Sequence, residues 1–106
     1  MTEPRRGFIY WAEIDKRRPF LVASPDIRNR LASDVMGVPC SSRLRPLAWH
    51  VLLQRGEGGL PAESMAKCES ILTIPKEALG TALGEALSTA RMREIERAMM
   101  RALGIA

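Results

Sequence analysis

Residues Gly7 to Val22 read GFIYWAEIDKRRPFLV, and this stretch holds two apolar runs separated by a short charged segment. The first run is Phe8 to Ile14, the second is Phe20 to Val22, and residues 15–19 (DKRRP) lie between them. Aromatic and β-branched residues bounded by turn-forming residues are typical of strands. The pattern therefore predicts two strands joined by a tight charged turn, with the fixed cation of Arg18 at the mouth of a sheet.

The length and composition indicate one domain. A chain of 106 residues can bury roughly 60–70% of its unfolded surface, so we expect one compact core and a single domain over residues 1–106. The formal charge of +4 is uneven, because residues 1–55 hold ten basic and five acidic side chains, and residues 56–106 hold six and seven. A basic half suits a polyanion such as nucleic acid, or an acidic protein. Charge alone favours the plainer interpretation of a solvated surface.

Cysteine usage and hydropathy give no sign of secretion or of a membrane. Cys40 and Cys68 lie far apart in apolar company, so neither a disulfide framework nor a metal motif is indicated. The N-terminal MTEPRRGF lacks the apolar run of a signal peptide, and no stretch approaches the length that spans a bilayer. We therefore expect a cytoplasmic protein with buried thiols, no metal site, no cofactor and no membrane partner.

Two helices are predicted in the remaining chain. Ser24 or Asp26 supplies a side-chain oxygen that can cap a short helix over residues 27–31. Ser88 can cap a longer helix over residues 90–103, which Gly104 ends. One apolar stripe of the longer helix is expected to face the sheet, and its members are Met92, Ile95, Met99 and Leu103.

Further strands are expected over residues 34–42, 47–53, 64–74 and 81–83. Gly37 and Pro39 predict a bulge or an end within the first of them, because proline cannot donate to a ladder and glycine marks close backbone approach. Short strands followed by a closing helix are typical of an α+β or small-barrel architecture.

The residue types restrict the chemistry. His50 is the one histidine of the chain, and within a strand and without a visible partner it is read as a structural imidazole. The sequence has no zinc-protease, Walker or serine-hydrolase motif, so any reaction falls to Arg, Lys, Ser and Glu. An arginine fork matches the charge on a phosphate under attack, and a serine hydroxyl can position a phosphate oxygen. RNA supplies its own nucleophile, the 2′-OH, so an RNA-cleaving site needs none from the protein.

Seven short motifs follow one another along residues 6–105. They are GxIYWxxxD at 7–15, Arg-Pro-x-Leu-Val at 18–22, Asn-Arg at 29–30, Val-Pro-Cys-Ser-Ser at 38–42, Gly-Leu-Pro with a following Ser at 59–64, Cys-Glu-x-Ile-x-Thr-Ile at 68–74, and Leu-Gly at 103–104. In this order and spacing they resemble the MazF/PemK/Kid family of toxin endoribonucleases.

The resemblance implies an α+β, mainly β fold: a small, twisted SH3-like barrel of the CcdB/MazF/PemK type, with a short helix after the second strand and a C-terminal helix. It also implies a homodimer that cleaves single-stranded RNA at selected sequences without a metal, leaving a 2′,3′-cyclic phosphate and a 5′-hydroxyl. The protein partner that it implies is an acidic antitoxin whose flexible segment occupies the RNA-binding groove.

The family's usual catalytic pair falls on Arg18 and Ser41 of this chain. A second pair, which some members stress, falls on Lys67 and Glu69, with the acid as general base. RNA-binding side chains are expected at Lys16, Arg17, Arg28, Arg43, Arg45 and Trp49, with Tyr10 as an alternative stacking surface.

Plainer interpretations of these residues remain open. Arg18 could pair with Asp15 in the turn, the Ser41 hydroxyl could be satisfied by backbone, and Lys67 and Glu69 could form a surface ion pair. The chain also departs from the family, since its first hairpin loop is cut back to residues 15–18 and a leucine replaces the arginine of the usual Ile-Arg-Thr. These departures bear on the cleaved sequence more than on the reaction.

Two rival functions remain beside RNA cleavage. Gyrase poisons of the CcdB type share the fold, and their C-terminal Trp-Gly-Ile is partly matched by residues 103–105 (LGI). A catalytically degenerate member would bind RNA or antitoxin without cutting. The guanidinium of Arg18 and the hydroxyl of Ser41 discriminate between these possibilities.

Overall fold

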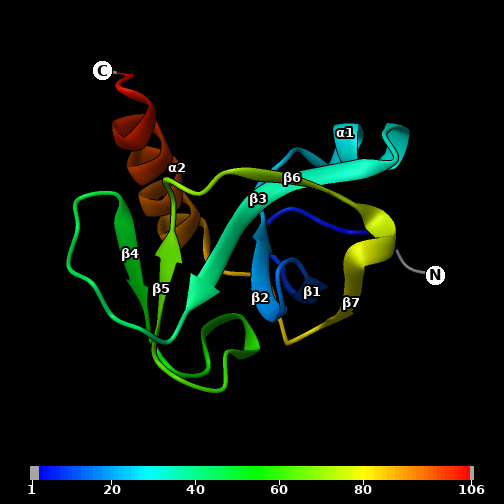
Figure 1. Cartoon of the computed structure of the whole chain (residues 1–106). Helices are drawn as coiled ribbons and strands as arrows, with labels where there is room; N and C mark the ends of the chain where they lie inside the picture. Colours follow the sequence, from blue (N-terminus) through cyan, green and yellow to red (C-terminus); the bar gives the residue numbers. More distant parts are fainter. Residues whose placement is uncertain (1–2, 106) are drawn as a thin grey trace.

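The computed structural model describes residues 3–105, which form seven strands and two α-helices. In chain order the elements are β1 (Ile9–Glu13), β2 (Arg17–Val22), α1 (Asp26–Leu31), β3 (Asp34–Ser41), β4 (His50–Leu53), the 3₁₀ turn η1 (Glu57–Gly59), β5 (Ser64–Lys67), β6 (Leu72–Pro75), the 3₁₀ turn η2 (Lys76–Ala78), β7 (Leu79–Ala82) and α2 (Thr89–Leu103). Figure 1 shows α2 beside β4 and β5, and α1 at the other end of the molecule near the start of β3. The predicted α+β, mainly β architecture, with a short helix after the second strand and a C-terminal helix, is confirmed.

The strands pair antiparallel in the order β4-β5-β3-β2-β1-β7, and β6 pairs with β3. β1 and β2 form the predicted hairpin, with Tyr10 opposite Phe20 and Glu13 opposite Arg17. The second strand begins at Arg17, before its apolar run, because the charged residues after the turn continue the ladder. Arg18 therefore lies within a strand of the sheet.

β3 is the longest strand and joins two parts of the sheet. Its first part pairs with β2 on one side and β6 on the other, and its last two residues pair with β5. The predicted bulge or early end at Gly37 and Pro39 is wrong, because the strand continues through them. Gly37 does mark close backbone approach, since a Cβ there would collide with the Leu21 carbonyl. Pro39 lies where β3 changes partner from β6 to β5, a place where a missing N–H is tolerated.

The core occupies two faces of the twisted sheet. One cluster packs α2 against the sheet and includes Leu21 and Ile95, neither of which is exposed. A second cluster contains Phe20, Val22 and Val35. Because successive side chains of a strand point to opposite faces, the alternation along β2 places the two clusters on opposite sides.

The two cysteines are free and lie buried in the α2 cluster. Burial raises the pKa of the Cys40 thiol and of the Cys68 thiol to about 12. Each thiol is therefore protonated and unreactive at physiological pH. The prediction of buried thiols is confirmed.

The start of α1 differs from its prediction. The N-cap is Pro25, and no side chain caps the helix. The Asp26 carboxylate instead accepts from the backbone N–H of Arg6 at 2.7 Å, and Ser24 Oγ accepts from the N–H of Met36 at 3.0 Å. The predicted cap by Ser24 or Asp26 is wrong because these oxygens have partners outside the helix.

α2 has the predicted ends. Ser88 Oγ accepts from the N–H of Arg91 at 3.1 Å, and Gly104 adopts a left-handed φ of 73° after the last turn. Across residues 3–105, no helix has both the length and the apolar character required to cross a membrane.

The apolar stripe of α2 is shorter than predicted. Met92 and Ile95 are buried against the sheet, and Met99 is partly buried on the same cluster. Leu103 is 62% exposed, so its predicted place in the core is wrong. The last turn of the helix has no strand beneath it and leaves an apolar end on the surface.

Three predicted strands have other boundaries. The segment 47–53 forms a strand only from His50, because residues 42–49 are an exposed loop. The segment 64–74 divides into β5 and β6 around a turn that the Ser70 N–H closes on the Lys67 carbonyl at 2.9 Å. The final strand covers Leu79–Ala82 in place of residues 81–83.

Candidate active site

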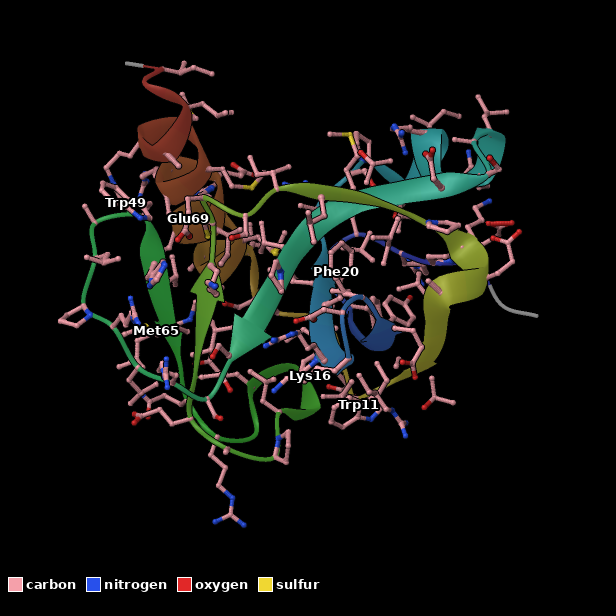
Figure 2. All side chains as sticks on the ribbon, viewed as in Figure 1. Trp11, Lys16, Phe20, Trp49, Met65 and Glu69 are labelled. Carbon is pink, nitrogen blue, oxygen red and sulfur yellow. The ribbon has the colours of Figure 1, made fainter. Side chains whose placement is uncertain are left out.

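A cleft of about 790 Å³ lies between the start of β2, the end of β3, strands β4 and β5, and the loop 42–49. Figure 2 shows Lys16 and Trp11 beside the β1–β2 turn and Glu69 beyond the far end of β5. The described residues that line this space, here called the basic cleft, include one carboxylate, Glu69, and six cations. The cations are Lys16, Arg17, Arg18, Arg43, Arg45 and Lys67.

Strand pairing brings the predicted catalytic residues to the basic cleft. β2 and β3 run antiparallel, so Arg18 near the start of one strand lies at the same end of the sheet as Ser41 at the end of the other. Ser41 pairs with β5, and further along β5 Lys67 lies directly opposite His50 on β4. The row from Arg18 to His50 thus crosses four neighbouring strands.

The Arg18 guanidinium forms a bidentate ion pair with a carboxylate. Its Nε and Nη2 donate to the two oxygens of Asp15 at 2.8 and 2.9 Å. These hydrogen bonds hold the pKa of Asp15 well below its usual range. The Asp15 side chain is 66% exposed, so water screens the pair and its contribution to stability is small. A phosphate offers the same pair of acceptor oxygens and can exchange with Asp15.

Ser41 has a backbone partner and keeps a free donor. Its Oγ accepts from the N–H of Arg43 at 3.1 Å, a bond that shapes the chain as it leaves β3. A hydroxyl that accepts one hydrogen bond still has its own proton to donate. Ser41 can therefore donate to a phosphate oxygen in the basic cleft.

Glu69 pairs with His50 rather than with Lys67. His50 Nε2 lies 3.0 and 2.9 Å from the two Glu69 oxygens, and Nδ1 lies 3.2 Å from the carbonyl oxygen of Arg45. A carbonyl and a carboxylate only accept, so the ring nitrogen that carries the proton donates to the partner it faces. The His50 side chain is 3% exposed and that of Glu69 is 35% exposed. The sequence indicated a histidine without a partner, and the structure gives it two.

Opposing effects act on the Glu69 carboxyl. Burial raises its pKa, but the hydrogen bonds from His50 and from its own backbone, together with the Lys67 charge, lower it further than burial raises it. The pKa of Glu69 therefore lies below its usual range. The group is an anion at physiological pH.

The predicted RNA-binding residues divide into two sets. Lys16, Arg17, Arg43 and Arg45 line the basic cleft. Three others do not line it. Arg28 lies on α1 and donates to the Asp34 carboxylate at 2.7 Å. Trp49 is the last residue of the 42–49 loop, directly before β4. The Tyr10 hydroxyl accepts a hydrogen bond from the N–H of Arg5.

Trp11 lines the basic cleft and was missed in the sequence. The Arg17 guanidinium lies over its ring, 4.8 Å from the centroid. The strand register would have predicted this pair. Glu13 lies opposite Arg17 and Trp11 lies opposite Pro19, so Trp11 and Arg17 are diagonal neighbours on the same face of the hairpin. That register depends on where β2 starts after the turn, which the apolar pattern places too late.

The described residues contain no group of three or more His, Cys, Asp or Glu side chains that could hold a metal ion.

A twisted antiparallel sheet with a basic cleft and a C-terminal helix defines a protein suited to binding a single-stranded polyanion. The family described as the PemK-like, MazF-like toxins of type II toxin–antitoxin systems matches residues 5–103, and the chain belongs to this family.

The most similar relatives include two proteins of Mycobacterium tuberculosis. The chain is 32% identical to the probable endoribonuclease MazF5 over 94 residues, which cover 87% of the chain and 85% of that relative. It is 30% identical to the endoribonuclease MazF4 over 106 residues, which cover 99% and 97%. These relatives do not favour the gyrase-poison alternative.

Solved structures show the same fold. An endoribonuclease from a mycobacterial species superimposes with a TM-score of 0.86 at 30% identity, covering 99% of this chain and 95% of that one. An endoribonuclease in complex with its cognate antitoxin, also mycobacterial, gives 0.82 at 28% identity, covering 100% and 98%. The predicted MazF/PemK-type fold is confirmed.

Proposed function

We propose that this protein is the endoribonuclease toxin of a type II toxin–antitoxin system and cuts single-stranded RNA in the basic cleft. The names of its relatives support the activity. The observation that carries the proposal is the meeting of Arg18 and Ser41 in a cleft lined by six cations. A cleft of this charge suits the RNA backbone.

Cleavage uses the RNA's own 2′-OH. The 2′-oxygen gives its proton to water and attacks the adjacent phosphorus, the bond from phosphorus to the 5′-oxygen breaks, and that oxygen takes a proton from water. The products are a 2′,3′-cyclic phosphate and a 5′-hydroxyl. This route requires neither a protein nucleophile nor a metal ion.

Arg18 and Ser41 stabilise the phosphate under attack. The guanidinium leaves Asp15 for two phosphate oxygens, and the Ser41 hydroxyl donates to one of them. A donor aimed at developing negative charge contributes about 3 kcal/mol to catalysis. Lys67 adds a further cation along β5. Catalytic roles for Lys67 and Glu69 stay predictions.

The other cations of the basic cleft hold the RNA strand. Lys16, Arg17, Arg43 and Arg45 contact phosphates on either side of the cut. Trp11, covered by Arg17 on one side, offers a stacking surface for a base. Arg28 is not among these RNA-binding cations, because it lies on α1 and donates to the Asp34 carboxylate of β3.

Two protein partners belong to the proposal. Exposed apolar side chains lie on β4 and at the C-terminal end of the chain, and a second copy of the chain covers some of them in a homodimer; they are Leu52, Met100, Leu103 and Ile105. An acidic antitoxin segment occupies the basic cleft through complementary charge. A similar endoribonuclease is known in complex with its cognate antitoxin, which supports this partner. The proposed place of action is the cytoplasm.

The test is incubation of the purified protein with a long single-stranded RNA in EDTA, followed by mapping of the ends. We expect cuts that leave cyclic phosphates, lost in Arg18→Ala and reduced in Ser41→Ala. Arg93→Ala is the matched control, because Arg93 lies on α2 outside the basic cleft. RNA that stays intact, or cutting that persists in Arg18→Ala, would overturn the proposal.

A further inference from the structure

One corner of the basic cleft carries the only carboxylate among its described lining residues, Glu69. Glu69 sits on the turn after β5, which the Ser70 N–H closes on the Lys67 carbonyl. The backbone of Trp49 lies next to this turn, because the Cys68 N–H donates to the Trp49 carbonyl at 3.1 Å. Figure 2 shows Lys16, next to the Arg18 turn, well apart from Glu69.

The Glu69 carboxylate is held in one orientation. Its two oxygens face His50 Nε2 at 3.0 and 2.9 Å, and the imidazole is itself fixed by Arg45 through Nδ1 and is almost fully buried. Carboxylate oxygens have further lone pairs, so Glu69 can accept more hydrogen bonds from the open side of the cleft. Glu69 is therefore an oriented acceptor facing the substrate space.

A fixed anion repels phosphate, so its partner on an RNA strand is a group with N–H donors. The exposed Watson–Crick edge of an unpaired base supplies such donors. Proton abstraction is the competing role, and it suits Glu69 poorly, because its lowered pKa makes the carboxylate a weak base.

We propose that Glu69 reads one nucleobase of the RNA near the cut, with His50 as the positioning residue that holds the carboxylate. An acceptor-only group selects a base with an exocyclic amino group, which adenine, cytosine and guanine have. It disfavours uracil, whose one donor on this edge, N3–H, lies between two carbonyl oxygens that repel the carboxylate. The inference rests on the proposed function, since RNA is the ligand.

The first test maps cut sites in a random single-stranded RNA library. For the unaltered protein we expect one position near the cut at which uracil is disfavoured roughly tenfold, the usual size of one good base contact. Glu69→Gln can turn its amide to accept from or donate to a base, so we expect it to accept uracil there while still cutting its best sequence. Loss of cutting at every sequence in Glu69→Gln would assign the residue to proton transfer and overturn the inference, as would an unchanged preference.

The His50 variants separate positioning from folding. His50→Leu removes the hydrogen bonds at similar bulk and should relax the uracil discrimination, whereas His50→Gln keeps a donor and should restore part of it. A thermal unfolding curve of each variant shows whether it is folded. Folded His50→Leu protein with unaltered discrimination would contradict the positioning role.

A binding readout covers the case in which the protein cuts no RNA. Because the chain has one histidine, its ring N–H signals are unambiguous in NMR spectra. A ring N–H that is hydrogen-bonded to Glu69 and nearly buried should be visible, and its signal should shift in Glu69→Gln. Oligonucleotides with a 2′-deoxy nucleotide at the cut, differing by cytosine or uracil at the read position, should bind with roughly tenfold different affinity. If the protein cuts no RNA but binds the cytosine oligonucleotide more tightly than the uracil one, only the proposed activity is wrong. Equal affinities for the two oligonucleotides would overturn the inference.

Discussion

Arg18 already holds two carboxylate oxygens in the geometry in which we propose that it holds a phosphate. Asp15 is then a competitor that RNA displaces. Replacing it with asparagine removes one negative charge from the mouth of the basic cleft and weakens the competing contact. The residue next to the reaction therefore has a role in affinity that sequence motifs do not reveal.

We expect Asp15→Asn to bind a non-cleavable RNA oligonucleotide about two- to fivefold more tightly, the range expected from an exposed ion pair. Fluorescence anisotropy measures this affinity. Asp34→Asn is the control, because its partner Arg28 lies outside the basic cleft. Weaker binding by Asp15→Asn would show instead that Asp15 orients Arg18 for the phosphate.

Single residues were predicted well where a motif carries them and poorly where a partner decides. The family motifs placed Arg18 and Ser41 in one cleft, and the structure brings them to the same end of the sheet. His50 was read as a structural imidazole, which fits its burial, but its partner, Glu69, stands on a turn after the neighbouring strand, which no periodic pattern reveals. Arg28 was predicted to bind RNA because of its charge, but its guanidinium donates to the carboxylate of Asp34, six residues further along the chain.

At the scale of elements, β3 can pair closely with β2 because residue 37 is a glycine. A Cβ on Gly37 would collide with the backbone of β2, which cannot move without breaking the ladder. We expect Gly37→Ala to lower the free energy of unfolding by about 2–3 kcal/mol, measured by urea denaturation.

Gly80→Ala is the matched control on β7, since a Cβ there meets its nearest atom at 3.5 Å, an ordinary contact. Its free energy of unfolding should change by less than about 0.5 kcal/mol. Equal losses in the two variants would show that the close approach at Gly37 does not limit the strand.

The 3₁₀ turn η1 is tied to α2 by one ion pair. Arg91 donates to Glu57 from Nε at 2.9 Å and Nη2 at 2.7 Å, and these hydrogen bonds lower the pKa of Glu57. A carboxyl whose pKa is lower in the folded state stabilises the fold above its ordinary pKa of about 4.3. That stability is lost as the pH falls through the lowered, folded pKa.

We therefore expect Glu57→Gln to be less stable than the unaltered protein by about 1 kcal/mol at neutral pH. The difference should shrink toward zero as the pH falls below about 4. Unfolding curves between pH 7 and pH 3 measure it, with Glu63→Gln as the control on an exposed loop. A difference that stays constant over this range would rule out the ion pair as its cause.

Elements were easier to predict than their ends. The first hairpin and α2 follow from alternation, helical spacing and a serine cap, which are local signals. The 47–53 segment was predicted too long because its leucine and tryptophan are apolar but lie in an exposed loop. Whether such residues are covered depends on the surface around them, which the local pattern does not contain.

For the whole molecule, the uneven charge of the sequence becomes a basic cleft. Of the ten basic residues in the first half of the chain, five line it, and Lys67 joins them from the second half. RNA affinity should therefore fall steeply with salt, with a logarithmic slope of about −0.7 for each phosphate contacted.

Arg43→Ala should reduce the magnitude of that slope by about 0.7, because one phosphate contact is lost. Arg93→Ala, on the surface of α2 outside the basic cleft, should leave it unchanged. Titrations of a non-cleavable oligonucleotide at several salt concentrations measure both slopes. A larger change of the slope in Arg93→Ala than in Arg43→Ala would indicate that the RNA lies along α2 and not in the basic cleft.

The central claim is that this chain cuts RNA with the RNA's own 2′-OH. The most direct measurement compares a cleaved RNA oligonucleotide with the same oligonucleotide carrying one 2′-deoxy nucleotide immediately 5′ to the scissile phosphate. We predict that the substituted oligonucleotide still binds but is not cut at that phosphate. Cutting of the 2′-deoxy substrate at an undiminished rate would contradict the account.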